Sequence, residues 1–149
     1  MKKLAVLAVV VLLGAGVLAD GGQIYAQCAG CHQVNGQGIP GAFPPLAGEL
    51  PRIVAKGDAG RKYLIQVVLF GLQGPIVAQG KSFNGVMPPF AHLTDAEVAA
   101  VLNHVLTSWG NDKLPKGFKP FSAAEVKALR ARKLTPQQVF ADWKKLGLK

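Results

Sequence analysis

The sequence predicts a mainly α-helical fold with one small β-hairpin and a C-terminal extension of two helices. Apolar residues recur at helical spacing in several short segments. Three segments also begin with Ser or Thr followed three residues later by Glu or Gln, which is the pattern of a capping box. Half of the 149 residues are apolar and 17% are charged, so the chain can bury the core of one domain.

Residues 1–19 are expected to be a secretory signal peptide. Two lysines precede an apolar run at 4–19, and cleavage is expected before Asp20 because Ala19 is small. The alternative is an uncleaved signal that anchors the protein in the membrane. We favour cleavage, because a membrane-spanning helix needs roughly 20 apolar residues and this run is shorter. The mature chain is therefore expected in the periplasm.

The first mature helix is expected at residues 23–31, with Asp20 as its N-cap, and it contains the motif Cys-x-x-Cys-His. This motif is the attachment site of a c-type haem. Its spacing lets one helical turn present Cys28 and Cys31 to the same porphyrin edge, where each thiol can form a thioether with a vinyl group. His32 then points its imidazole at the iron. We therefore expect one covalently bound haem c.

Two other interpretations of the cysteine pair fit less well. A thioredoxin-like redox pair would need a βαβ context, which the sequence does not show. A zinc site would need a second pair of ligands, and the chain has only two cysteines. Covalent haem is attached outside the cytoplasm, so this cofactor also agrees with the expected export.

The rest of residues 20–110 is expected to complete one haem domain. A Gly- and Pro-rich stretch at 35–46 has no regular period, and we expect it to form an ordered wall beside the haem. Further elements follow in chain order: helices at 49–55 and 61–70, a hairpin around Gln79-Gly80, and a helix that opens at the capping box of Thr94 and Glu97 and stops at Gly110.

Residues 111–149 are expected to form a basic helical extension. Ser122 and Glu125 make a capping box for a helix that reaches about residue 133. Thr135 caps the last helix, whose first position is a proline and whose third is a glutamine. Apolar positions in both helices suit a packed element rather than a disordered arm: Val126, Leu129, Val139 and Trp143.

The charge is unevenly distributed between these two parts. Residues 20–110 carry five basic and five acidic side chains, whereas 111–149 carry ten basic and three acidic ones. The two parts are therefore expected to differ in role, with docking on the neutral domain and stabilisation by the extension. We expect a monomer that has no nucleic-acid partner and reaches the membrane only through its protein partners.

Met87 is the expected second axial ligand of the haem iron. It is the single methionine of the mature chain, and Pro88 and Pro89 restrict the loop behind it. Ligation by a thioether raises the reduction potential of a haem. The alternative is a methionine of the core, which is the usual fate of a lone Met. His92 and His104 are the competing ligands.

Taken together, these features resemble class I cytochromes c. The matching motifs are Cys-x-x-Cys-His, Pro-Pro-Leu-Ala-Gly at 44–48, Asn-Gly-x-Met-Pro at 84–88, and the helix that ends Ser-Trp-Gly at 108–110. The sequence is most similar to the soluble monohaem cytochrome c of thermophilic bacteria that serves a haem–copper terminal oxidase. That protein also has a basic C-terminal extension like Gly-Phe-Lys-Pro-Phe at 117–121.

The resemblance implies the class I cytochrome c fold around one haem. Cys28 and Cys31 would hold this haem, and His32 and Met87 would be its axial ligands. The extension would lie as a clamp over the back of the domain.

The resemblance also implies roles for residues around these ligands. The second ring nitrogen of His32 would donate to the carbonyl of Pro44, which sets the tautomer. Leu46 and Phe90 would line the haem pocket. Asn84 would donate toward the methionine sulfur or toward a haem propionate.

The function implied by the resemblance is that of a soluble periplasmic one-electron carrier, not an enzyme. It would receive electrons from an upstream quinol-oxidising complex and deliver them to a terminal oxidase. One alternative is a haem subunit of a larger respiratory dehydrogenase or oxidase complex. Another is a haem peroxidase, which would need an open iron and polar residues on the distal side.

Overall fold

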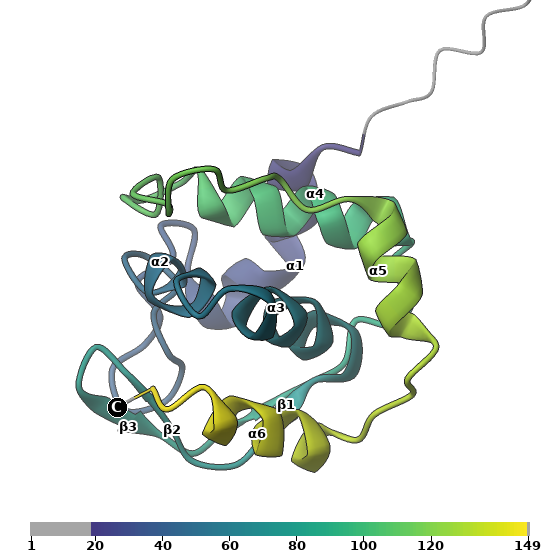
Figure 1. Ribbon diagram of the computed structural model, residues 1–149. Helices are drawn as coiled ribbons and strands as arrows, with labels where there is room; N and C mark the ends of the chain where they lie inside the picture. The colour runs from purple at the N-terminus through teal and green to yellow at the C-terminus, as the bar shows by residue number, and fades with distance from the viewer. Residues whose placement is uncertain (1–18, 149) are drawn as a thin grey trace, which may run out of the picture.

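Six α-helices and four short strands form residues 19–148, the part of the chain that the computed structural model describes (Figure 1). Nearly all of the expected signal peptide lies outside these residues. Among the described residues, no helix combines the length and the hydropathy needed to cross a membrane. In chain order the elements are α1 (Gly21–His32), α2 (Leu50–Val54), α3 (Asp58–Phe70), β1 (Leu72–Gln73), β2 (Ile76–Ala78), β3 (Lys81–Phe83), β4 (Val86–Met87), α4 (Asp95–Leu106), α5 (Ala123–Arg130) and α6 (Pro136–Lys145).

The helix starts are those that the capping pattern predicts. The Asp20 carboxylate accepts hydrogen bonds from two backbone N–H groups at the start of α1. Thr94, Ser122 and Thr135 each accept from the N–H three residues on, and the Glu or Gln there accepts from the cap N–H in return. All three capping boxes are therefore confirmed, and each satisfies donors that would otherwise be unpaired at a helix end.

Other helix boundaries differ from the prediction for steric reasons. α3 begins at Asp58 rather than at 61, and Gly60 lies inside it because its missing side chain lets the helix pass directly over the carbonyl of Ile53. α4 ends at Leu106 rather than near Gly110, since Trp109 already has a left-handed backbone with φ of 52°. α5 ends at Arg130, a few residues before the expected boundary.

The strands form two separate antiparallel pairs. The expected hairpin is present, with β2 paired to β3 through Ile76 opposite Phe83 and Ala78 opposite Lys81. The pairing of β1 with β4 was not expected from the sequence. It places Leu72 opposite Met87, so the segment that carries the methionine is tied to the chain immediately after α3.

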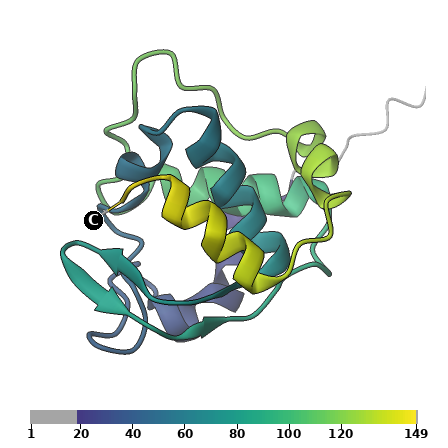
Figure 2. The ribbon, with the colours of Figure 1, turned by 60° about the horizontal axis from the view of Figure 1, so that its bottom comes forward.

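The extension runs around one side of the domain and packs on it. α5 contacts α4 and α3, while α6 contacts α3 and β1 (Figures 1 and 2). Arg61 on α3 is the main polar anchor. Its guanidinium lies over the rings of Phe118 and Phe121, with centroids at 4.9 and 4.2 Å, and it pairs with Glu125. Val126 and Val139 are fully buried, so both helices of the extension contribute to the core.

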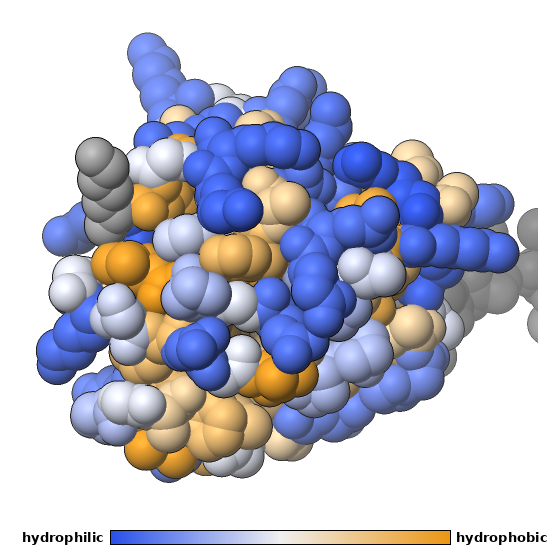
Figure 3. Space-filling model, turned by 90° about the horizontal axis from the view of Figure 1, so that it is seen from below, coloured by the Kyte–Doolittle hydropathy of each residue, from blue (hydrophilic) through white to orange (hydrophobic). Residues whose placement is uncertain are grey.

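The face of the molecule that is seen from below carries both hydrophilic and apolar side chains (Figure 3). Seen from below, one side of the molecule shows apolar residues gathered together beside a hydrophilic area (Figure 3). The large apolar side chains most open to solvent are Val34, at 80% exposure, and Val86, at 60%. Val86 lies on β4, next to Met87, and therefore on the rim of the cavity described below.

Candidate haem site

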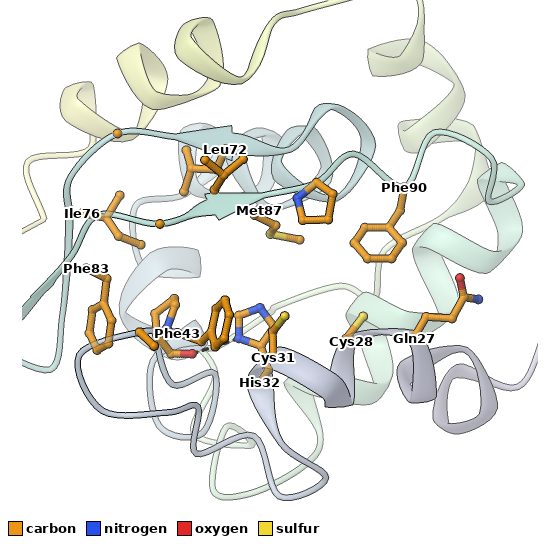
Figure 4. Close-up of a pocket in the computed structure, with 16 residues that line it drawn as sticks. Gln27, Cys28, Cys31, His32, Phe43, Leu72, Ile76, Phe83, Met87 and Phe90 are labelled. Carbon is orange, nitrogen blue, oxygen red and sulfur yellow. Dashed lines mark hydrogen bonds between the residues drawn. The ribbon is translucent and has the colours of Figure 1, made fainter.

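The motif of the first helix opens into a cavity with two adjoining parts. The outer part is bounded by α1 on one side and by the β1–β4 pair on the other (Figure 4). The inner part extends between α2, α3 and α4. Six residues line both parts: Cys28, His32, Pro44, Leu72, Ile76 and Met87. The two cysteines, the histidine and the methionine of the sequence analysis thus surround one space.

α1 presents the attachment motif to this cavity. Cys28 and Cys31 are three residues apart, so they lie on neighbouring turns of the same helix face, and both line the outer part. His32 is the last residue of the helix and is buried. The spacing therefore directs two sulfur atoms and one imidazole into the same space, as attachment of a haem requires.

The His32 ring is held by the Gly- and Pro-rich loop. Its Nδ1 lies 2.9 Å from the carbonyl oxygen of Pro44, and because a carbonyl only accepts, Nδ1 carries the proton. Burial lowers the pKa of His32, and the hydrogen bond to Pro44 offsets only part of this effect. The ring is therefore neutral at physiological pH with Nε2 as its free electron-pair donor, the form in which imidazole binds a metal.

Met87 lies across the cavity from His32 (Figure 4). It is partly buried on β4 and lines both parts of the cavity. His92 and His104 line neither part. His92 is exposed and bonds to Gln27, whereas His104 packs against the rings of Tyr25 and Trp109.

Of the other site residues expected from the sequence, three line the cavity and one does not. Pro44 borders both parts, Leu46 the inner part and Phe90 the outer part. The side chain of Asn84 is exposed and borders neither. Among the hydrogen bonds of the described residues none joins Asn84 to the methionine sulfur, and the alternative contact, with a haem propionate, stays a prediction.

Sequence reasoning missed several residues of the inner part. Tyr63, Glu49 and Trp143 border it, and each is buried. Burial raises the pKa of the Tyr63 hydroxyl, and the nearby Glu49 carboxylate raises it further. Helical periodicity marked Trp143 as a core position, but no local signal could show that a residue of the extension reaches the cavity.

The comparisons with known proteins agree with this geometry. The family model for cytochrome c matches residues 18–109. The chain belongs to the cytochrome c family. Cytochrome c-552 of Thermus thermophilus is 68% identical to this cytochrome over 131 residues, which cover 88% of the chain and 99% of the relative. A second cytochrome c-552 of the same species is 66% identical over 140 residues, covering 93% of the chain and 94% of the relative.

A more distant likeness is to part of a larger protein. The cytochrome c subunit of a quinone-dependent alcohol dehydrogenase from Gluconobacter oxydans is 37% identical to this cytochrome over 95 residues. The matched segment makes up 62% of this chain but only 19% of that subunit. Part of this chain therefore resembles part of a larger protein, whereas the likeness to the Thermus cytochromes spans nearly the whole chain.

Family and structure together establish a haem electron carrier of class I. The mainly α-helical fold matches the expectation, and the cytochrome carries one covalently attached c-type haem, for which Cys28 and Cys31 fit the attachment motif. The cavity suits such a group, because its lining is almost entirely apolar and its few polar groups are concentrated at the motif and in the inner part.

Proposed function

We propose that this cytochrome is a soluble periplasmic one-electron carrier in which His32 and Met87 are the axial ligands of the haem iron. The observation that carries the proposal is the position of these two side chains on opposite sides of one apolar cavity (Figure 4). A bound haem supplies the redox chemistry by taking up and releasing one electron. The chain's own residues orient the ligands and keep water away from the iron.

In this proposal, the two axial ligands are held in position by different contacts. On the proximal side, the hydrogen bond to Pro44 fixes the imidazole tautomer and its ring plane before and after electron transfer. On the distal side, β-pairing with Leu72 holds Met87, and the two prolines that follow restrict the chain. Because both ligands are pre-positioned, little structure has to change when the charge of the site changes by one.

The distal lining argues against a peroxidase. The residues around Met87 in the outer part are Leu72, Val86, Pro88 and Phe90. None of these side chains can donate or accept a proton, whereas peroxide cleavage needs such a group near an open iron. A carrier needs only that solvent and ligands be excluded.

The second candidate is a fixed haem subunit of a respiratory dehydrogenase. It is favoured by the 37% identity to the Gluconobacter dehydrogenase subunit. The free carrier is better supported, because the likeness to the Thermus cytochromes includes the extension and covers 99% of the first relative. Purification from native membranes and from the soluble fraction separates the two: a fixed subunit remains with its complex at high salt, and a free carrier does not.

The location and the partners belong to the same proposal. Export through the N-terminal segment would bring the chain to the compartment in which covalent haem is attached. A carrier there would take electrons from a quinol-oxidising complex and pass them to a haem–copper terminal oxidase. Reduction of the cytochrome by the first complex and its reoxidation by the second, each in purified form, test these two steps separately.

The decisive experiment measures ligand binding by the ferrous protein. Carbon monoxide should bind slowly or not at all to the wild type at neutral pH, and readily to Met87→Ala, whose reduction potential should also fall. Val34→Ala is the matched control, since it shortens an 80% exposed side chain that borders neither part of the cavity, and it should behave as the wild type. Ready binding of carbon monoxide by the wild type would refute the proposed ligation and point to an enzyme.

A further inference from the structure

The last helix of the extension lies directly against the strand that supports Met87. The ring of Phe140 on α6 covers the backbone of Gly74, such that a Cβ atom added there would come within 2.5 Å of the ring. One turn earlier, the amide of Gln137 donates to Gln73 on β1 at 2.6 Å. α6 therefore holds β1 and the residue after it by one apolar and one polar contact.

β1 in turn holds the methionine. The register pairs Leu72 with Met87 and Gln73 with Val86. Beyond β4, the N–H of Phe90 donates to the carbonyl of Val68 at 2.9 Å, which ties the end of the methionine loop to α3. With only two residues each, these strands have little stability of their own. Their position must come from the elements that pack on them.

α6 also reaches the cavity itself. Trp143 is 9% exposed and borders the inner part together with Leu72 and Met87. Its ring stacks on that of Phe140, with centroids 5.8 Å apart and planes at 13°. The two aromatic rings thus form a continuous support from Gly74 to the inner part of the cavity, which Met87 also lines.

We propose that α6 is a positioning element for the distal ligand: Phe140 and Trp143 hold the β1–β4 pair closed and so set how easily Met87 leaves the iron. The inference rests on the proposed function, in which Met87 binds the iron. It assigns the extension a role in ligation beyond thermal stability. In physical terms, the two rings raise the free energy of a local opening that involves β1 and β4 rather than the whole domain.

The test compares two truncations of buried side chains within the same extension. Phe140→Ala removes the ring over Gly74, whereas Val126→Ala removes a fully buried side chain of α5, which packs on α3 and α4. Both variants should lower the melting temperature. The readout is the rate at which cyanide binds the ferric, full-length holoprotein, since cyanide has to wait until the methionine leaves.

Phe140→Ala should speed cyanide binding by about tenfold or more, which corresponds to about 1.4 kcal/mol in the free energy of opening. Val126→Ala should leave the rate at the wild-type value. Phe140→Leu and Gln137→Ala provide milder versions in case Phe140→Ala does not fold, and each should accelerate binding in the same direction.

Two outcomes separate this inference from the proposed function. If wild-type ferric protein has no methionine–iron charge-transfer band, Met87 is not the ligand and both proposals fail. If the band is present but the Phe140 and Gln137 variants bind cyanide no faster than Val126→Ala does, the role of α6 in positioning is refuted while the ligation stands.

Discussion

The carbonyl oxygen of Pro44 accepts a hydrogen bond from Nδ1 of His32 at 2.9 Å, and a second bond binds the same two segments together. The N–H of Gly38 donates to the carbonyl of His32, also at 2.9 Å. Gly38 lies so close to residues 43–44 that an added Cβ would lie 2.6 Å from the Pro44 oxygen. The loop therefore forms hydrogen bonds with both the backbone and the ring of His32.

Gly38→Ala should disturb these contacts between the loop and His32. Its backbone has φ of +68°, and its new methyl group would meet the carbonyl groups of residues 43 and 44. We expect a loss of stability of about 2–5 kcal/mol, because the left-handed conformation costs about 1–2 kcal/mol and overpacking about 1–3 kcal/mol. The Pro44 carbonyl should also move away from His32, which should change the reduction potential. Denaturation and redox titration measure the two effects.

Gly41→Ala is the control for the cost of placing alanine in a left-handed backbone conformation. Gly41 belongs to the same loop and has φ of +77°, but an added Cβ would meet no atom within 4 Å. It should cost only about 1–2 kcal/mol for the left-handed conformation and leave the potential unchanged. An equal change of potential in both variants would show that the contact with Pro44 does not tune His32.

Removal of either attachment cysteine should reduce the amount of holoprotein sharply. Cys28→Ser and Cys31→Ser each leave a single thiol for the haem, whereas the wild type should keep its haem through denaturation and acid–acetone extraction. Gly30→Ser is the matched control, because it lies between the cysteines, is exposed and has free space around its Cβ. Extraction of the haem from the wild type by acid–acetone would contradict covalent attachment.

Arg61→Met should detach part of the extension. The substitution removes the ion pair with Glu125, the bonds to two carbonyl groups and the stacking on Phe118 and Phe121. An exposed pair contributes about 0–1 kcal/mol and a cation–π contact about 0.5–1 kcal/mol, so the expected loss is about 1–3 kcal/mol at pH 7. Lys62→Met, the exposed neighbour on α3, should have almost no effect.

The loss caused by Arg61→Met should also depend on pH. Burial raises the pKa of Glu125, but hydrogen bonds from Arg61 and Ser122 outweigh it and hold the pKa below its ordinary value. A carboxyl whose pKa is lowered on folding stabilises the protein above its unfolded pKa, about 4.3 for Glu. This contribution disappears as the pH falls through the folded pKa. The difference in free energy of unfolding between wild type and Arg61→Met should therefore decrease as the pH falls from about 5 through the folded pKa of Glu125. A difference that does not change with pH would show that the ion pair is not its cause.

Electron transfer to the oxidase should depend only weakly on salt. Among residues 19–148, no Asp, Glu, Lys or Arg lines the outer part of the cavity, and Val86 on its rim is exposed. Charges beyond about 8 Å from a contact are largely screened at physiological ionic strength. Lys144 lies near this rim, since its ammonium is 5.2 Å from the centroid of the Phe140 ring that covers Gly74, but a single charge steers a partner only weakly. The second-order rate should thus change a few-fold at most with ionic strength. A steep fall that disappears when Lys144 and Lys145 are neutralised would make the extension the docking site instead.

Sequence reasoning succeeded where the determining contacts are local. A capping box links residues three apart, as at Thr94 and Glu97, and the attachment motif spans a single helical turn, so both could be identified without a structure. The same holds for the β2–β3 hairpin, whose turn is Gln79-Gly80. In each case the interacting residues are close in the chain, and few alternative partners compete.

The remaining features depend on contacts between distant segments. The pairing of Leu72 with Met87 joins two-residue strands that have no alternation to detect, and Trp143 reaches the cavity from 56 residues beyond Met87. The sequence predicts that α3 begins after Gly60, because glycine is unfavourable inside a helix. Only the close packing against Ile53 explains why Gly60 lies within α3. Asn84 was placed by resemblance; its side chain is exposed, and its contact with a haem propionate stays a prediction.

The contact between Gly74 and Phe140 also constrains how this sequence can diverge. At position 74 any side chain meets the aromatic ring and must adopt φ near +145°, so glycine is required as long as α6 is docked with an aromatic residue at 140. Without a helix docked there, the ring no longer excludes a side chain, and only the backbone conformation favours glycine. In an alignment that includes relatives with and without this helix, glycine at 74 should therefore be lost and gained together with the C-terminal helix, although the two positions lie 66 residues apart.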